Sequence, residues 1–234
     1  MHIAVLVTNT DQSAFAARHP RDAEKFTVLL KTARPDWQVT TFEVTENDFP
    51  ASLQGFDGLL IGGSPASVND ENHWIERLSD LIRQAHGAGV PMMGVCFGHQ
   101  AIAQALGGTV GPNPGDFILG TTETTFTARA PWMPAEARKI TLASAHGEQV
   151  TALPQGAEVL GESPACPVAA YRIGTLVFAT QHHPEMTPAF LAALVEEFAP
   201  EFPPEIGRHA RASLAQAPEG PRFAEWIARF FEQA

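Results

Sequence analysis

The sequence predicts an α/β protein with a mostly parallel central sheet, helices on both faces, and antiparallel strands added in its C-terminal half. Two of the observations that predict this fold come from the first half of the chain. Apolar runs at residues 2–7 and 57–61 are typical of strands buried on both faces, and helical patterns separate such runs. Strands that alternate with helices pair in parallel through right-handed crossovers. The third observation is that strand patterns beyond Gly107 follow one another without helices between them.

Each predicted strand and helix follows from a local pattern in the sequence. Continuous apolar or alternating runs predict strands at residues 2–7, 38–44, 57–61, the run ending at Val95, 117–127, 139–144, 157–160, 168–171 and 175–180. The last of these is expected to return to the main sheet. Apolar residues at helical spacing predict helices at residues 22–32, after a cap at Asn69 or Asp70, at 97–106, at 187–198 and at the C-terminal end.

The C-terminal helix carries one apolar stripe, which we expect to pack on the core of the protein, with a partner interface as the alternative. The stripe consists of Phe223, Trp226, Ile227, Phe230 and Phe231. Prolines near residues 200–204 and 218–221 separate this end from what precedes it. We therefore expect a domain at residues 1–200 and a helical extension at 201–234 that packs on it.

Composition excludes several classes of function. The chain has 234 residues and a net charge of −11, which argues against a nucleic-acid or anionic-membrane partner. Its two cysteines, Cys96 and Cys166, form neither a disulfide framework nor a metal-cluster pattern. No apolar run approaches the roughly 20 residues of a membrane span, and the N-terminus lacks the basic segment of a secretion signal. A cytoplasmic protein is the simplest expectation.

Cys96 lies where an apolar strand runs directly into a helix. Glycines at both of its second neighbours, Gly94 and Gly98, would relieve crowding at such a sharp turn, as in a nucleophile elbow. Backbone N–H groups and the dipole at the start of the helix would stabilise the thiolate. The alternative is a buried structural cysteine. The pattern makes Cys96 a candidate nucleophile.

A second polar cluster follows the last predicted strand, in the run Gln-His-His-Pro-Glu at residues 181–185. Residues two apart in an extended segment face the same way, so His183 and Glu185 can form an imidazole and the carboxylate that orients it. Alternatively, they are polar surface residues before a helix. A metal site at His182 and His183 has no evident third ligand, and we expect neither a metal nor a cofactor.

The third cluster is the run Gly-Gly-Ser-Pro at residues 62–65, which ends another predicted strand. Glycines there let the backbone approach a ligand closely. The N–H groups of Gly63 and Phe97 could form an oxyanion hole, although an ordinary turn is the alternative. The run lacks the lysine and the spacing of a phosphate-binding loop.

In combination and order, the runs at 62–65, 94–100 and 181–185 resemble the signatures of class I (triad) glutamine amidotransferase domains, such as those of GMP synthase, and free-standing GMP-synthase-like members in particular. The resemblance covers roughly residues 40–195. It implies a flavodoxin-like three-layer α/β sandwich. It also implies that Cys96, His183 and Glu185 form the triad. Two departures are His182, where phenylalanine is usual, and Ser64, where many members have proline.

The resemblance implies further site residues and an activity. Backbone donors would come from Gly63 and Phe97, and Gln100 and His146 would bind substrate. The activity would be cleavage of the γ-amide of glutamine or of a γ-glutamyl compound. Three alternatives stay open: a glutaminase subunit with a separate synthetase partner, a free-standing γ-glutamyl peptidase, and a non-catalytic regulatory module that keeps the fold. The residues after Phe198 are too few for a synthetase domain.

Overall fold

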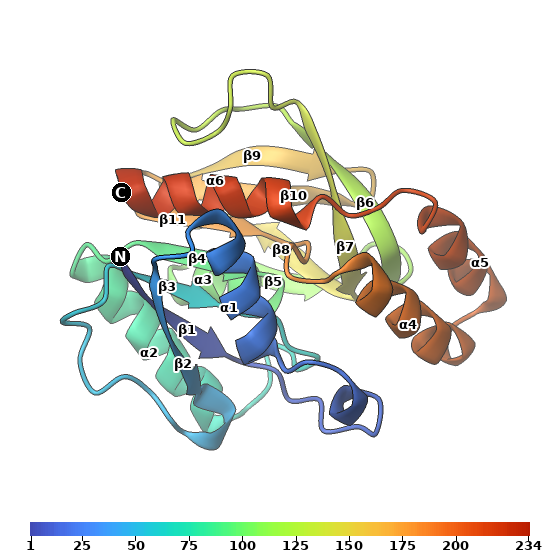
Figure 1. Cartoon of the computed structure of the whole chain (residues 1–234), viewed down its shortest axis with the longest axis horizontal. Helices are drawn as coiled ribbons and strands as arrows, with labels where there is room; N and C mark the ends of the chain where they lie inside the picture. Colours follow the sequence, from blue (N-terminus) through green and yellow to red (C-terminus); the bar gives the residue numbers. More distant parts are fainter.

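The computed structural model describes residues 1–234, which form a nine-stranded mixed sheet, a separate two-stranded sheet and helices around them (Figure 1). The strands are β1 His2–Val7, β2 Gln38–Glu43, β3 Gly58–Ile61, β4 Met92–Val95, β5 Thr109–Pro112, β6 Ile118–Phe126, β7 Lys139–His146, β8 Glu148–Ala152, β9 Ala157–Ser163, β10 Cys166–Ile173 and β11 Val177–Thr180. The α-helices are α1 Asp22–Ala33, α2 His73–Gly87, α3 Phe97–Ala105, α4 Pro188–Phe198, α5 Pro204–Ser213 and α6 Gly220–Gln233. No helix combines the length and the apolar character needed to cross a membrane.

The parallel half of the large sheet runs in the order β2-β1-β3-β4-β11. This is the strand order of flavodoxin-like sheets. The predicted α/β class is therefore confirmed, and so is the return of the last strand to the main sheet, since β11 pairs with β4 in parallel.

The other half of the sheet is antiparallel, in the order β10-β9-β6-β7. The sequence predicts these strands, and their bounds differ from the predicted ones by at most three residues. It does not predict the two-stranded sheet of β5 and β8. These strands are short and contain few apolar residues, so their pairing depends on tertiary contacts that the local pattern does not show.

Two apolar cores lie on opposite faces of the sheet because successive side chains of a strand alternate between faces. In β1, Ile3 and Val5 pack with α1 and α6, whereas Ala4 and Leu6 pack with α2 and α3. Figure 1 shows α1 and α6 side by side on one face. A third, smaller cluster joins α4 and α5 to β6 and β7. Helices on both faces produce the predicted three layers.

One predicted helix start is wrong. Helix α2 begins at His73 with Asn72 at the N-cap, not after Asn69 or Asp70. The Asp70 carboxylate instead accepts a hydrogen bond from the Ser67 N–H at 3.0 Å. Asp70 therefore stabilises the turn before the helix, which is a common alternative use of a short acidic side chain.

The apolar stripe of α6 is buried against the sheet. Its five large side chains are each at most 2% exposed: Phe223, Trp226, Ile227, Phe230 and Phe231. Trp132, from the segment between β6 and β7, packs edge-on against Phe230 with ring centres 5.0 Å apart. The stripe is thus not a free interface in this structure. The division of the chain at residue 200 stays a prediction.

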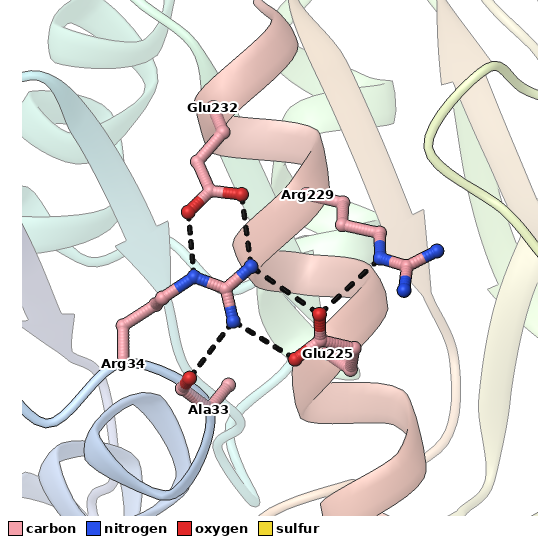
Figure 2. Close-up of polar contacts among 5 residues, drawn as sticks. All are labelled: Ala33, Arg34, Glu225, Arg229 and Glu232. Carbon is pink, nitrogen blue, oxygen red and sulfur yellow. Dashed lines mark hydrogen bonds and ion pairs between the residues drawn. The ribbon is translucent and has the colours of Figure 1, made fainter.

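Polar contacts hold α6 from the outside. Arg34, at the C-terminal end of α1, donates hydrogen bonds to the carboxylates of Glu225 and Glu232 on α6 (Figure 2). Arg229 also donates to Glu225. The hydrogen bonds that Arg34 donates to the two glutamates raise the pKa of its guanidinium above its usual range. Two carboxylates on one planar guanidinium fix the angle between α1 and α6.

Replacement of Arg34 by methionine is expected to lower the free energy of unfolding by about 1 kcal/mol, the upper end of what accessible ion pairs contribute. The Arg34 side chain is 24% exposed, so its pairs are better shielded than most on the surface. Urea unfolding at low salt measures the change. Arg208→Met is the matched control, because the Arg208 side chain is 67% exposed and its ion pair should contribute much less. Equal losses in both variants would contradict a specific role for Arg34.

Candidate active site

The three sequence clusters meet at the carboxyl ends of β3, β4 and β11, which are neighbours in the sheet. Gly62 and Gly63 follow β3, Cys96 follows β4, and the segment 181–185 follows β11. Ligands of open α/β sheets bind beyond the carboxyl ends of the strands. Cys96, His183 and Glu185 are each at most 6% exposed, so the site is nearly closed to solvent.

Cys96 has a backbone conformation that non-glycine residues rarely adopt, with φ 50° and ψ −103°. The turn is sharp because β4 ends at Val95 and α3 begins at Phe97. A Cβ atom at Gly94 would lie 2.7 Å from the carbonyl oxygen of Gly98, and one at Gly98 would collide with the Ile61 backbone. Both glycines are therefore required by close packing, as expected of a strained nucleophile elbow.

The side chains of His183 and Glu185 point toward each other. His183 Nδ1 donates to Glu185 Oε1 at 2.7 Å, and the His183 N–H donates to the Ala143 carbonyl at 2.8 Å. Burial alone would lower the pKa of His183, but the charges of Glu185 and Cys96 raise it well above its usual range. His183 Nε2 has no hydrogen-bond partner. The carboxylate thus fixes one ring nitrogen and leaves the other available.

Gly63 lies against the other two clusters. A Cβ atom there would come within 2.8 Å of His183 Cε1 and 3.6 Å of Cys96 Cβ. Two hydrogen bonds hold the glycine loop: Thr8 Oγ1 donates to the Gly63 carbonyl, and the Gly98 N–H donates to the Gly62 carbonyl, both at 2.9 Å. No hydrogen bond of the structure uses the Gly63 N–H. The place of this N–H group in an oxyanion hole stays a prediction.

Gln100 and His146 also lie near this edge, and both contact Glu148. Gln100 Nε2 donates to the Glu148 carbonyl at 2.9 Å and to Gln181 Oε1 at 3.1 Å. His146 Nδ1 donates to the same carbonyl at 3.1 Å, and its Nε2 is buried without a partner. The amide nitrogen of Gln100 is already used within the protein. A substrate-binding role for either residue stays a prediction.

Three buried histidines surround the site, and sequence reasoning assigned no such cluster. His182 Nδ1 is hydrogen-bonded to Ser144 Oγ at 2.8 Å, which joins the site segment to β7. Burial lowers the pKa of His99 to about 3, that of His146 to about 4, and that of His182 well below its usual range. The sequence singles out His146 and His182 separately but not His99. His182 is a neutral, polar side chain at the position where phenylalanine is usual in the family that the sequence resembles.

These buried imidazoles are expected to make the fold sensitive to acid. A histidine in the unfolded chain has a pKa near 6.5, whereas burial lowers the pKa of His99 in the folded protein to about 3. The unfolded state therefore binds more protons in that interval, and stability falls as pH is lowered from about 6.5 toward the folded pKa. In His99→Phe, which keeps a ring beside Tyr171, the slope of stability against pH should fall by about one proton.

Urea unfolding between neutral pH and pH 4 measures this slope. His73→Phe is the control, because the side chain of His73 is 80% exposed and gains no buried environment on folding. A slope in His99→Phe equal to that of the parent protein would contradict the burial argument.

Cys166 is the other cysteine of the chain, and its surroundings differ from those of Cys96. It is the first residue of β10 and is fully buried. Burial raises the pKa of the Cys166 thiol to about 12. A thiol that stays protonated at neutral pH is a poor nucleophile, so Cys96 is the better candidate.

The fold and the site together define a class. It is an α/β protein that carries a cysteine at a strand-to-helix elbow, with a paired histidine and glutamate at the end of the adjacent parallel strand. Residues 25–198 match the glutamine amidotransferase class-I family, and the chain belongs to that family. The resemblance on which the sequence interpretation rests is therefore confirmed.

Two curated relatives differ in how much of their length the match covers. The chain is 30% identical over 184 residues to "Gamma-glutamyl peptidase 4" of Arabidopsis thaliana, which covers 73% of this chain and 70% of the relative. It is 32% identical over 158 residues to "GMP synthase [glutamine-hydrolyzing]" of Actinobacillus pleuropneumoniae serotype 5b, which covers 64% of this chain but only 28% of that one.

Solved structures share the fold over nearly the whole chain. A glutamine amido transferase from Methylobacillus flagellatus aligns with a TM-score of 0.72 at 25% identity, covering 98% of this chain and 93% of the other. A glutamine amidotransferase from Thermotoga maritima aligns with a TM-score of 0.74 at 14% identity, covering 99% and 98%. The second likeness concerns the fold alone. Both confirm the predicted architecture of a parallel core with antiparallel additions.

Proposed function

We propose that this protein hydrolyses the γ-amide of glutamine or of a γ-glutamyl compound, with Cys96 as nucleophile, His183 as acid and base, and Glu185 as the group that orients His183. The observation that carries the proposal is the 2.7 Å pair of His183 and Glu185, buried beside the strained Cys96 elbow. Nucleophile, base and orienting carboxylate are the parts that covalent amide hydrolysis needs.

In the proposed reaction, the Cys96 thiolate attacks the γ-carbonyl carbon. The N–H groups of Gly63 and Phe97 would stabilise the resulting oxyanion. His183 then gives a proton from Nε2 to the leaving ammonia or amine as the C–N bond breaks, which leaves a γ-glutamyl thioester. Water, deprotonated by His183, attacks the thioester and releases glutamate and the thiolate. No cofactor enters any of these steps.

We propose γ-glutamyl peptides as a second candidate class of substrate, in addition to free glutamine. The match to the peptidase covers 70% of that relative, whereas the match to the GMP synthase covers 28%. A non-catalytic module is disfavoured, because the buried carboxylate and imidazole of the pair carry a desolvation cost that an inactive site has no need to keep.

The test is release of product by the purified protein. Glutamine and a set of γ-glutamyl dipeptides are supplied separately, and ammonia or free amine is measured, with α-linked dipeptides as the matched control. The proposal expects turnover of at least one γ-linked substrate and none of the α-linked ones. A protein that stays inert with all γ-linked substrates, yet releases ammonia from glutamine once cell extract is added, would instead be a synthetase-dependent subunit.

A further inference from the structure

Gln181 lies beside the candidate nucleophile because of strand register. Thr180 of β11 pairs with Val95 of β4 in parallel, so the next residues along the two strands, Gln181 and Cys96, are neighbours. The Cys96 N–H donates to the Thr180 carbonyl, and the Gln181 N–H donates to the Ala169 carbonyl, both at 2.9 Å. Backbone hydrogen bonds therefore fix the positions of Gln181 and Cys96 independently of any contact between their side chains.

The side-chain amide of Gln181 is aimed at the sulfur. Gln181 Nε2 donates to Cys96 Sγ at 3.5 Å, within hydrogen-bond range for sulfur. Gln181 Oε1 accepts from Gln100 Nε2, which also donates to the Glu148 carbonyl. Because Gln181 Oε1 already accepts a hydrogen bond, the side-chain amide of Gln181 is held with its N–H group toward Cys96, and the flipped orientation is disfavoured. Both glutamines are buried, so water does not compete for these bonds.

We propose that Gln181 is a positioning residue that holds the Cys96 thiolate with a side-chain N–H donor, and that Gln100 acts through Gln181 by fixing the orientation of its amide. This inference rests on the proposed function for its catalytic meaning. It assigns Gln100 a different main role from the substrate contact that the family resemblance implies. Hydrogen bonds to a charged partner are stronger than those to a neutral one, so this donor favours the thiolate over the thiol.

The first experiment is alkylation of Cys96 by iodoacetamide, which needs no substrate. Rates are measured from acid to alkaline pH in the parent protein, Gln181→Met, Gln100→Met and Gln104→Met, with circular dichroism to check the fold. Methionine keeps the length of the side chain and removes the N–H donor. Gln104 is the matched control, since it lies one turn beyond Gln100 on α3 and its Nε2 donates to Val68 instead. Cys166 is fully buried with its pKa raised to about 12, so it should react much more slowly than Cys96.

Loss of a hydrogen bond to a charged group should lower the alkylation rate of Gln181→Met at neutral pH by about tenfold. The difference should close at alkaline pH, where Cys96 is ionised in every variant. Gln100→Met should show a smaller loss of the same form, and Gln104→Met none. A parent-like pH profile in Gln181→Met, or an equal loss at every pH, would overturn the inference. If Gln181→Met does not fold, Gln100→Met alone decides it.

Steady-state kinetics give the second readout. A positioning role predicts that Gln100→Met lowers kcat and leaves KM nearly unchanged, because only the nucleophile is disturbed. A raised KM with unchanged kcat would show direct substrate contact and overturn the role given to Gln100. If no substrate is turned over by any variant, the proposed function fails, while the alkylation profile still decides the contact between Gln181 and Cys96.

Discussion

Replacement of Cys96 by serine is expected to abolish γ-amide hydrolysis while the protein stays folded. Serine differs by one atom and fits the same backbone turn, with φ 50°, so the elbow itself should survive. A hydroxyl is far less acidic than a thiol, and neither the helix N-terminus nor His183 can ionise it to a comparable extent. Loss of the nucleophile of such a triad costs at least about 10⁴-fold in kcat.

Product release from a γ-linked substrate, measured together with circular dichroism, checks this result. Cys166→Ala is the control, because that thiol is buried at the start of β10, where burial raises its pKa to about 12 and so keeps it protonated. The control should keep the activity of the parent protein. A folded Cys96→Ser variant with full activity would contradict the assignment of the nucleophile.

The second large expected effect is a difference in activity between variants of His183 and variants of Glu185. His183→Ala removes the group that transfers protons, whereas Glu185→Gln removes only the charge that orients and stabilises it. In triads of this kind, loss of the histidine costs about 10–100-fold more than loss of its carboxylate. Glu185 contributes to raising the pKa of His183, so Glu185→Gln should also shift the pH dependence of the residual activity toward acid.

Rates for both variants on one substrate, across a range of pH, test this order. Glu197→Gln on α4 provides a control for loss of a carboxylate, since its pair with Arg18 lies on the surface. If folded Glu185→Gln is less active than folded His183→Ala, the roles of the two residues have been exchanged in this account.

The sequence predicts most of the site because short-range rules govern it. Gly94 and Gly98 indicate the elbow in the sequence, since a side chain at either position would collide with backbone atoms. The spacing of His183 and Glu185 places them on one side of an extended segment, and the structure joins them at 2.7 Å. Apolar runs likewise predict the parallel strands, whose burial on both faces leaves a strong local pattern.

What the sequence does not predict depends on contacts between distant segments. The bond from Gln181 to Cys96 requires the register of β11 on β4, and the bond from His182 to Ser144 requires that β7 pass beside the site. The short strands β5 and β8 pair although β6 and β7 lie between them in the sequence. None of these pairings has a local signal, because hydrogen-bond partners far apart in sequence leave no periodic pattern.

The most direct test of the central claim is partition of the proposed γ-glutamyl thioester between water and hydroxylamine. The purified protein is supplied with glutamine, and separately with a γ-glutamyl dipeptide that it turns over, at one fixed concentration of hydroxylamine. Both substrates would form the same thioester on Cys96, so we expect the same ratio of γ-glutamyl hydroxamate to glutamate from each. A ratio that changes with the leaving group, or no hydroxamate from either substrate, would contradict a covalent intermediate at this site.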